Sequence, residues 1–556
     1  MSKFTKFLTA SLICAVFGAG TAFGSEMLQI PIHSFEELRK IGKDQSFPLG
    51  VSYVLMNDID ASPSRGMNDG KGFEPIEAAG DFDGNGYVIR GLYINRPDED
   101  SVGLFRHIRR YSGGSSMGPD GPIPWLSRVR NLVIEADSII GRNYVGVLAG
   151  SSDGIVQDVH TAGNVRGAKM IGGVVGANSG TVRKSGSSAN VYSHVSPLSG
   201  SSAGGLAGVN IGTIDSSRAS GNVFGGRSRV GGLVGFNDIS TAEDVDFYAA
   251  LGAITNSYAT GNVTSMEGNA GGLVGTNAGR IERSYATGAV NAAMGVAGGL
   301  VGYNATMVSP DVIPAMFMGG HIRDTYATGD VTAPIYAGGL IGYNRVFDEL
   351  DFAPQCMPTF LITTSYAVGR VTGDSLFGGL IGFNERPWVV ANSFWDVTTS
   401  GVDTSAGGEG KTTAEMMMQA TFNNEYPGGG LFWDFQNVWR INEGESYPYF
   451  IYQDATTTSI FRDRVTSTRN RTNAAMPAVS VRGRTLNVKL PSSMQSSSTQ
   501  NLQVRMINMR GRTAASFKIV NGIDNSFLLT KIPAGRYIVE VRNAGGRVGS
   551  TPVVVR

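Results

Sequence analysis

Hydrophobic positions in this chain fall in short runs separated by Gly, Asn and Ser, and one seven-residue phrase returns along its middle. The phrase is Gly-Gly, two aliphatic residues, Gly, a variable residue and Asn. Its copies are GGVVGAN at 172–178, GGLAGVN at 204–210, GGLVGFN at 231–237, GGLVGTN at 271–277, GGLVGYN at 298–304, GGLIGYN at 338–344 and GGLIGFN at 378–384, with a weaker copy, GVLAGSS, at 146–152. Short apolar runs between turn residues predict β-strands.

A second phrase lies between copies of the first. It is Ser-Tyr-Ala-Thr-Gly-Asn-Val at 257–263 and recurs at 284–290, 325–331 and 365–371, with a more divergent copy at 217–223. The shortest units are about 27 residues long, and longer ones carry an insertion directly after the Asn of the first phrase, at 238–253, 305–321 and 345–361. We therefore expect all three insertions to project from the same corner.

A unit this short cannot bury its apolar face alone, whereas coils stacked at the strand spacing of about 4.8 Å bury a continuous column. We expect the repeated Leu and Val to form ladders inside that column. We expect the glycines to allow positive φ at corners and to let neighbouring backbones approach closely. The Asn either occupies a left-handed corner or stacks as an amide ladder. The predicted fold class is all-β, a right-handed parallel β-helix followed by a small C-terminal Ig-like β-sandwich.

The GG-L-V-G-x-N phrase resembles the GLUG motif, a repeat of bacterial surface proteins and of the non-catalytic region of some immunoglobulin A peptidases. The resemblance spans about residues 28–452 and includes a short helix at Phe35–Leu38. An open β-helix end must be covered. We expect this cover from Trp395, Trp433, Phe435 and Trp439, with a helix over 412–422 opened by Thr412 or Thr413.

The N-terminus reads as a signal peptide. Lys3 and Lys6 precede the apolar run Phe7–Phe17 and a stretch of small residues, which predicts cleavage after Gly24, with Ala22 as the alternative. No later run has the length of a membrane span. The expected location is extracellular or on the outer cell surface.

Charge divides the chain in two. The net charge is zero, but residues 455–556 hold 16 Lys and Arg against 3 Asp and Glu. The body is therefore acidic, which argues against nucleic acid as a partner. Cys14 leaves with the signal peptide, so Cys356 remains as a single thiol, and no disulfide within the chain or cysteine-based metal site is expected.

The C-terminal part carries alternating runs typical of strands, at 485–490, 502–508, 515–519, 526–529, 536–541 and 551–555. The phrase Gly535-Arg536-Tyr537-Ile538-Val539-Glu540-Val541 is similar to the type A C-terminal sorting domain of the type IX secretion system. The resemblance implies passage across the outer membrane by that machinery, then removal of the domain or attachment to the surface. The alternative is an ordinary terminal β-sandwich that binds a ligand.

The predicted domain organisation has six parts. They are a signal peptide at 1–24, an N-terminal cap and first coils at 25–145, the repeat solenoid at 146–390, a C-terminal cap at 391–452, a linker at 453–477 and the sorting sandwich at 478–556.

The sequence patterns for a metal site or a peptidase site are weak. The run Asp81 to Gly86 imitates half a calcium loop, but its twelfth position is Leu92, so a tight turn is favoured. His160 and His321 lack a zinc-binding HExxH pattern and are expected on the surface or at turns. Only the repeat of the peptidases is recognisable, and no metal or cofactor is expected.

Two residue patterns leave alternatives open. Asp58 and Asp60 alternate on one strand, where paired carboxylates can serve polysaccharide cleavage, but adjoining coils offer no second acidic cluster. Four tyrosines recur in register and are expected to stack in the core or as an exposed strip suited to sugar rings. They are Tyr258, Tyr285, Tyr326 and Tyr366.

The insertions contain aromatic and methionine side chains that can bind a ligand or pack on each other. These are Phe247, Tyr248, Met316, Phe317, Met318, Phe347, Phe352 and Phe360, with Cys356 in the last insertion. The sequence thus indicates a non-enzymatic adhesin or display protein, with a polysaccharide or a host or matrix surface as its ligand. A carbohydrate-active enzyme, a glycan-binding protein or a structural envelope component without a specific ligand are the alternatives.

Overall fold

The structure is a computed structural model that divides the chain into two compact units, Met1–Thr457 and Thr458–Arg556. It describes residues 29–111, 117–118, 121–122, 125–194, 200–238, 252–309, 316–347, 361–423, 432–453, 478–482, 484–489, 503–508, 513–518, 524–543 and 546–555. The signal peptide, both cysteines and nearly all of the linker lie outside these residues.

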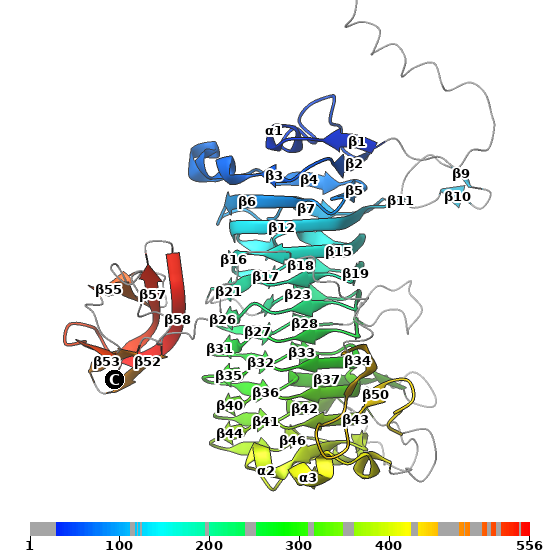
Figure 1. The fold of residues 1–556 in the computed structure, drawn as a ribbon, viewed down its shortest axis with the longest axis vertical. Coiled ribbons are helices and arrows are strands. Elements are labelled where there is room, and N and C mark those ends of the chain that lie inside the picture. Colours follow the sequence, from blue (N-terminus) through cyan, green and yellow to red (C-terminus); the bar gives the residue numbers. More distant parts are fainter. Residues whose placement is uncertain are drawn as a thin grey trace, which may run out of the picture. The chain divides into compact units, whose positions relative to one another are not determined.

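The first unit is a parallel β-helix in which each coil adds strands to the same stacked sheets (Figure 1). Sheet B is formed by β4 (Ile76–Ala79), β7 (Phe105–Ile108), β14 (Ala149–Ser152), β18 (Val175–Asn178), β23 (Ala207–Asn210), β28 (Val234–Asn237), β33 (Val274–Asn277), β37 (Val301–Ser309), β42 (Ile341–Phe347) and β46 (Ile381–Asn384), with β38 (Met316–Met318) antiparallel to β37. Sheet C is formed by β13 (Asn143–Val145), β17 (Lys169–Gly172), β22 (Ser201–Gly204), β27 (Ser228–Gly231), β32 (Asn269–Gly271), β36 (Val296–Gly298), β41 (Tyr336–Gly338) and β45 (Leu376–Gly378).

Sheet A contains the remaining strands of the coils. It begins with β1 (Gln29–Ile32), β2 (Ser52–Leu55), β3 (Ile59–Asp60), β5 (Phe82–Asp83), β6 (Val88–Asn95) and β12 (Arg128–Ile140). It continues with β15 (Ile155–Ala162), β16 (Asn164–Gly167), β19 (Thr181–Arg183), β20 (Gly186–Ser187), β21 (Asn190–Ser193), β24 (Thr213–Asp215), β25 (Arg218–Ala219), β26 (Val223–Gly225), β29 (Ala253–Thr255), β30 (Tyr258–Ala259), β31 (Val263–Ser265), β34 (Arg280–Ala286), β35 (Val290–Ala292), β39 (His321–Ala327), β40 (Val331–Ala333), β43 (Ile362–Ala367), β44 (Val371–Gly373), β47 (Val390–Ala391), β48 (Phe394–Asp396) and β49 (Glu409–Lys411).

The aliphatic ladders predicted from the repeat are present. Leu206, Leu233 and Leu273 are fully buried, as are Val234 and Val274 on the following strands. Equivalent residues pair in register from coil to coil, for example Val234 with Val274. The column of apolar side chains is therefore continuous through the coils, which is the packing that a single coil could not achieve.

The motif glycines serve close approach and not positive φ. A Cβ atom on Gly272 would lie 2.0 Å from the carbonyl oxygen of Gly299 and 2.9 Å from the Cβ of Ala286. None of the three motif glycines of this coil has a positive φ. The expectation of positive φ at these corners was therefore wrong, since it is the narrow spacing between coils that requires a residue without a side chain.

The motif Asn residues form an amide ladder inside the helix. From Asn178 onward each Nδ2 donates to the Oδ1 of the Asn in the next coil, at 2.7 to 2.9 Å, through Asn210, Asn237, Asn277, Asn304, Asn344 and Asn384. None of these residues has a positive φ. The ladder alternative is confirmed and the left-handed corner is excluded for this position.

The left-handed corner lies instead before the Ser of the second phrase. Asn256 has φ of 50° and Arg283 has φ of 45°, and the corresponding residue of the next coil, Asp324, has φ of 49°. Hydrogen bonds between coils hold this corner, because Ser257 N donates to the Ser284 hydroxyl at 3.1 Å. Asn and Asp tolerate this conformation better than most residues.

The N-terminal cap follows the predicted elements. Helix α1 spans Phe35–Leu38, and the side chain of Ser34 accepts a hydrogen bond from Glu37 N. A turn at residues 85–86 joins β5 to β6. Two short antiparallel pairs leave the first coils, β8 (Arg110–Tyr111) with β11 (Trp125–Leu126) and β9 (Met117–Gly118) with β10 (Gly121–Pro122).

The C-terminal residues of the first unit lie partly at the end of the β-helix and partly along its flank. Trp395 packs in the main core and donates from its indole N–H to Val402 O at 3.0 Å, next to helix α2 (Val397–Ser400). Helix α3 is confirmed at Thr413–Met416, opened by a capping box between Thr412 and Glu415, and is followed by the 3₁₀ turn η5 (Gln419–Phe422).

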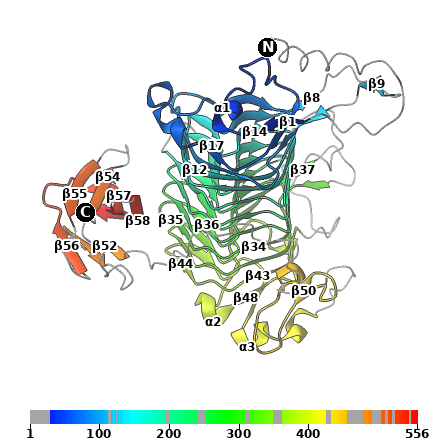
Figure 2. The same ribbon diagram turned by 45° about the horizontal axis from the view of Figure 1, so that its top comes forward.

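Residues 432–453, which we call the strap, turn back along the coils instead of covering the end (Figure 2). The strap contains β50 (Trp439–Arg440), β51 (Tyr449–Phe450) and the turn η6 (Ile451–Gln453). Trp433 and Trp439 are buried against the tyrosine ladder of sheet A. Trp439 packs on Tyr326 and Tyr366, so the prediction that it caps the open end was wrong. Trp433 packs both on Tyr366 of the ladder and on Phe394 and Phe422 near the last coil.

The carboxyl of Asp324 is buried beneath the strap, and burying its charge costs free energy. It is 5 % exposed and accepts hydrogen bonds from the Thr364 hydroxyl at 2.6 Å and from the Trp439 indole at 3.4 Å. Burial raises the pKa of its carboxyl. A folded-state pKa above the unfolded one means that its contribution to stability is complete below the unfolded pKa and is lost as pH rises through the folded pKa.

We therefore expect Asp324→Asn to raise the melting temperature at pH 7 and to leave it unchanged near pH 3. Asn retains the acceptor oxygen and tolerates the left-handed backbone, as Asn256 shows in another coil. Thermal unfolding at the two pH values measures the effect. The control is Asp330→Asn, an exposed carboxylate that accepts from Arg370 N and should have no effect at either pH. A less stable Asp324→Asn chain at pH 7 would contradict this account.

The second unit contains two antiparallel sheets. One has the order β52 (Ala478–Arg482), β53 (Thr485–Lys489), β56 (Asp524–Leu528), and the other the order β55 (Thr513–Lys518), β54 (Gln503–Asn508), β57 (Gly535–Asn543), β58 (Gly546–Val555). Leu486 from the first sheet and Val504 and Val539 from the second share one buried cluster. The strands predicted from alternation are present, while an Ig-like relationship stays a prediction.

Candidate functional site

The candidate carboxylates are held by neighbours that keep them ionised. Asp58 bonds to the Arg90 guanidinium at 2.6 Å, and this bond lowers the pKa of the carboxyl. Asp60 accepts from Ser62, which lowers its pKa as well. Cleavage of a glycosidic bond by two carboxyls needs one that stays protonated. Asp58 and Asp60 do not provide that arrangement.

The calcium-like run forms the predicted turn. Asn85 and Gly86 have φ of 52° and 80°. The carboxylate of Asp83 accepts from Asn85 N, from the Asn131 amide and from the Arg130 guanidinium, all at 3.0 Å or less. Its oxygens are therefore engaged within the fold.

The two histidines singled out from the sequence lie apart from each other. His160 is half-buried on β15, and His321 is half-buried at the start of β39. Within the described residues, no three His, Cys, Asp or Glu side chains come together as a metal site would require.

The tyrosine ladder is stacked and covered. Ring centroids of Tyr258 and Tyr285 are 4.9 Å apart, those of Tyr285 and Tyr326 4.7 Å, and those of Tyr326 and Tyr366 5.1 Å. Tyr285, Tyr326 and Tyr366 are at most 9 % exposed, because the strap lies over them. Packing in a core is confirmed for these three, and the exposed sugar-binding strip is excluded for them.

The three insertions begin and end in the same stacked columns, as predicted. They follow Asn237, Asn304 and Asn344 of the amide ladder, and β37 and β42 extend beyond the ladder as a pair, with Ala305 opposite Arg345. The aromatic, methionine and cysteine side chains predicted for binding lie outside the residues whose side chains the structure describes. Their role stays a prediction.

A different surface emerges at the corner between sheets B and C. The sixth position of the motif faces outward on sheet B, where Val209, Phe236, Thr276, Tyr303, Tyr343 and Phe383 follow one another in register. On sheet C the residue two places before the motif also faces outward, in the order Arg229, Asn269, Val296, Tyr336 and Leu376. We call these two files the outer strip.

The two files contact each other within each coil. The Arg229 guanidinium lies 4.1 Å from the ring centroid of Phe236. The Asn269 amide donates to the Thr276 hydroxyl at 3.2 Å, and the rings of Tyr336 and Tyr343 are 5.1 Å apart. The outer strip is therefore two side chains wide, although Thr276 and Val296 within it are buried.

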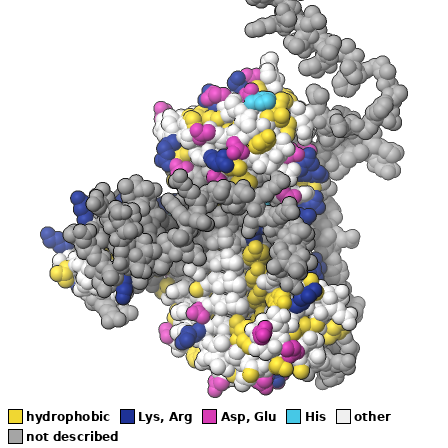
Figure 3. All heavy atoms as spheres, viewed as in Figure 1, with side chains coloured by type: hydrophobic (Ala, Val, Ile, Leu, Met, Phe, Trp, Pro, Cys, Tyr) yellow, Lys and Arg dark blue, Asp and Glu magenta, His cyan; other side chains and the backbone are white. Residues whose placement is uncertain are grey.

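The outer strip changes character toward its C-terminal coils, which we call the aromatic end. Tyr303, Tyr336, Tyr343 and Phe383 are half-buried there, and their neighbouring ring centroids are 5.1 to 5.5 Å apart. Leu376 beside them is 44 % exposed. Figure 3 shows hydrophobic side chains in a strip over the lower coils of this face.

Charged groups border the aromatic end. The Tyr343 hydroxyl donates to Glu385 at 2.5 Å, and the Arg345 guanidinium lies 3.7 Å from the same carboxylate. Burial and the Glu385 carboxylate raise the pKa of Tyr343, so its hydroxyl remains a neutral donor. Apolar rings and directional polar groups thus occur together.

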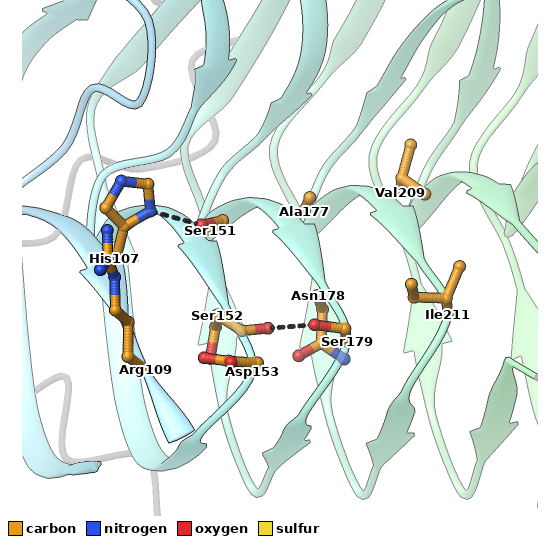
Figure 4. A pocket seen from close by; sticks show the side chains of 10 residues that line it. All are labelled: His107, Arg109, Ser151, Ser152, Asp153, Ala177, Asn178, Ser179, Val209 and Ile211. Atoms are coloured by element: carbon orange, nitrogen blue, oxygen red, sulfur yellow. Dashed lines mark hydrogen bonds between the residues drawn. The ribbon is translucent and has the colours of Figure 1, made fainter. Parts of the chain in front are cut away.

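At the opposite end of the sheet B file, a hollow of about 280 Å³ crosses several coils (Figure 4). His107 Nδ1 lies 2.8 Å from the Ser151 hydroxyl. Burial, and secondarily the charge of Arg109, lower the pKa of His107. Asp153 lines the same hollow, and its charge and that of Glu77 partly offset this lowering of the pKa.

Sequence reasoning identified the repeat but missed the outer strip. The signal was available, because the sixth position of the motif holds Ala, Val, Phe, Thr or Tyr while Gly and Asn stay fixed around it. A position that varies this widely in size cannot belong to a tightly packed ladder. Alternation then places it on the outer face.

Residues 226–264 and 267–291 match the family described as the GLUG motif. The chain carries GLUG repeats. A 181-residue segment is 36% identical to halomucin from Haloquadratum walsbyi, and a 150-residue segment is 32% identical to "Putative Gly-rich membrane protein" from Evansella cellulosilytica. These segments cover 31% and 26% of this chain but only 2% and 15% of those relatives.

A solved structure named "putative immunoglobulin A1 protease" from Bacteroides ovatus is 17% identical to the GLUG-repeat chain, with a TM-score of 0.32. The match covers 78% of this chain and 94% of that one. In the described residues, no helix is both long and apolar enough to cross a membrane.

Proposed function

We propose that this GLUG-repeat protein is exported to the outer cell surface and acts there in adhesion, with the β-helix as scaffold and the outer strip as contact surface. The observation that carries the proposal is the outward sixth position. It varies freely while the buried Gly, Leu and Asn ladders stay the same, so the contact surface can change without cost to the fold.

The predicted signal peptide and the type IX sorting resemblance of the second unit support export. The name of one relative, a membrane protein, is compatible with a place in the envelope. The proposed partners are the type IX machinery for the C-terminal domain and an extracellular surface ligand for the outer strip. We propose a non-enzymatic role, because the hydrogen bonds from Arg90 and Ser62 lower the pKa values of Asp58 and Asp60 and so disfavour the protonated carboxyl that glycosidic cleavage needs.

Intact mass of the surface and culture-medium protein in the native host tests export. We expect a species that starts near Ser25 and lacks the residues beyond about 477. An intact tail in the periplasm would contradict both sorting and adhesion. In parallel, a deletion strain should adhere less to surfaces than its parent, and the full-length gene should restore adhesion.

A further inference from the structure

The aromatic end of the outer strip is built differently from the rest of the surface. Its four rings lie in neighbouring columns of three successive coils and contact one another, so they form one apolar platform. Nothing in the core requires them, since Thr276 and Val209 occupy the same file in other coils. Single exposed hydrophobic residues are common, but a contiguous group on one edge marks a binding surface.

The polar groups at the platform restrict what it can bind. Glu385 and Arg345 are 30% and 44% exposed and carry opposite charges, so their fields largely cancel. A polyanion would need a net positive surface. An apolar protein surface would have to desolvate both charges, which costs free energy unless new partners are found.

A sugar ring matches both the apolar platform and the polar groups at its edge. One face of a pyranose presents C–H groups that can pack on an aromatic ring, and its hydroxyls donate and accept hydrogen bonds at the edge. Tyrosine offers the same combination of apolar body and polar tip. The coils repeat at about 4.8 Å, so a platform over several coils offers successive sites to an extended chain.

We propose that the aromatic end binds a neutral polysaccharide, with pyranose rings packed on Tyr336 and Tyr343 and hydroxyls bonded to Glu385 and Arg345. The inference rests on the proposed function and gives the class of its ligand. The His107 hollow lies in other coils, and the buried tyrosine ladder is covered by the strap, so neither contributes to this site.

Affinity electrophoresis of the full mature chain in gels containing mannan, xylan, galactomannan or hydroxyethylcellulose tests the proposal. We expect at least one of these polymers to retard the protein. Tyr336→Ala and Tyr343→Ala should each weaken that binding about tenfold, the effect of losing one packed ring. The matched control is Phe236→Ala, which removes a ring from the same file outside the aromatic end and should leave binding unchanged.

One further variant and a melting curve complete the test. Glu385→Gln should weaken binding less than the ring deletions, and unchanged melting of Tyr336→Ala will show that the fold is intact. Failure of all four polymers to bind, or equal weakening by Phe236→Ala, would overturn the proposal. A dimer that dissociates in Tyr343→Ala would overturn it in favour of a second copy. If adhesion by living cells persists in those cases, the adhesive function stands and only the ligand class falls.

Discussion

Gly272→Ala should destabilise the β-helix by about 3 kcal/mol or more, because the added methyl cannot be accommodated between the coils. The new Cβ would meet a backbone oxygen at 2.0 Å and a second Cβ at 2.9 Å. Backbone cannot rotate away as a side chain can, so the coils around Gly272 must separate and every ladder crossing that gap lengthens. The measurement is the melting temperature of the mature chain by circular dichroism.

The control for this change is Gly66→Ala in the N-terminal 3₁₀ turn η1 (Ser62–Gly66). A Cβ atom there meets nothing within 4 Å, and we expect a change of less than about 0.5 kcal/mol. Equal melting of the two variants would show that the spacing between coils is not what selects Gly in the motif.

Asn277→Ala should cost about 2 to 4 kcal/mol, since it interrupts the amide ladder in its middle. Asn237 loses a hydrogen-bond acceptor in the next coil, and the oxygen of Asn304 loses its donor. Asn277 is fully buried, so water cannot replace these partners without entering the core. Thermal unfolding of the variant, compared with the parent chain, measures the loss.

Two further substitutions bracket that result. Asn269→Ala removes an outward Asn with one side-chain hydrogen bond and should cost less than about 1 kcal/mol. Ser152→Asn should stabilise the chain by about 1 kcal/mol, because the oxygen of Asn178 is buried without a partner at the end of the ladder and would gain a donor. A destabilised Ser152→Asn chain would show that the first coil has no room for the longer amide.

Residues that repeat in the sequence were predicted well, since their environment repeats as well. Leu273 and Asn277 sit in the same surroundings in each coil, so one physical argument covers all copies. The positions of Trp433 and Trp439 were not predictable in this way. Trp439 packs on Tyr326, more than a hundred residues away, and Trp433 packs on Tyr366. Each of these contacts is made only once, and periodicity contains no information about such a contact.

The candidate site shows the same division. The sequence correctly placed the roots of the insertions in one corner, because a constant offset from Asn304 and Asn344 fixes them. The sequence left two possibilities for the tyrosines of the second phrase, packing in a core or exposure as a strip. The strap covers three of them, so these three are packed in a core. The outer strip was missed because its residues are of different types. They have in common only that their side chains face outward.

The strap also alters how the solenoid can come apart. Its hydrogen bonds reach Arg283 through Tyr452, Tyr326 through Gln453, Tyr366 through Pro448 and Asn392 through Trp433. In a stack where each coil touches only its neighbours, the last coil frays first and the others follow one at a time. Because the strap is bonded to several coils, these coils should unfold cooperatively. A force applied at the C-terminal side must therefore disrupt all of these coils at once and not one coil at a time.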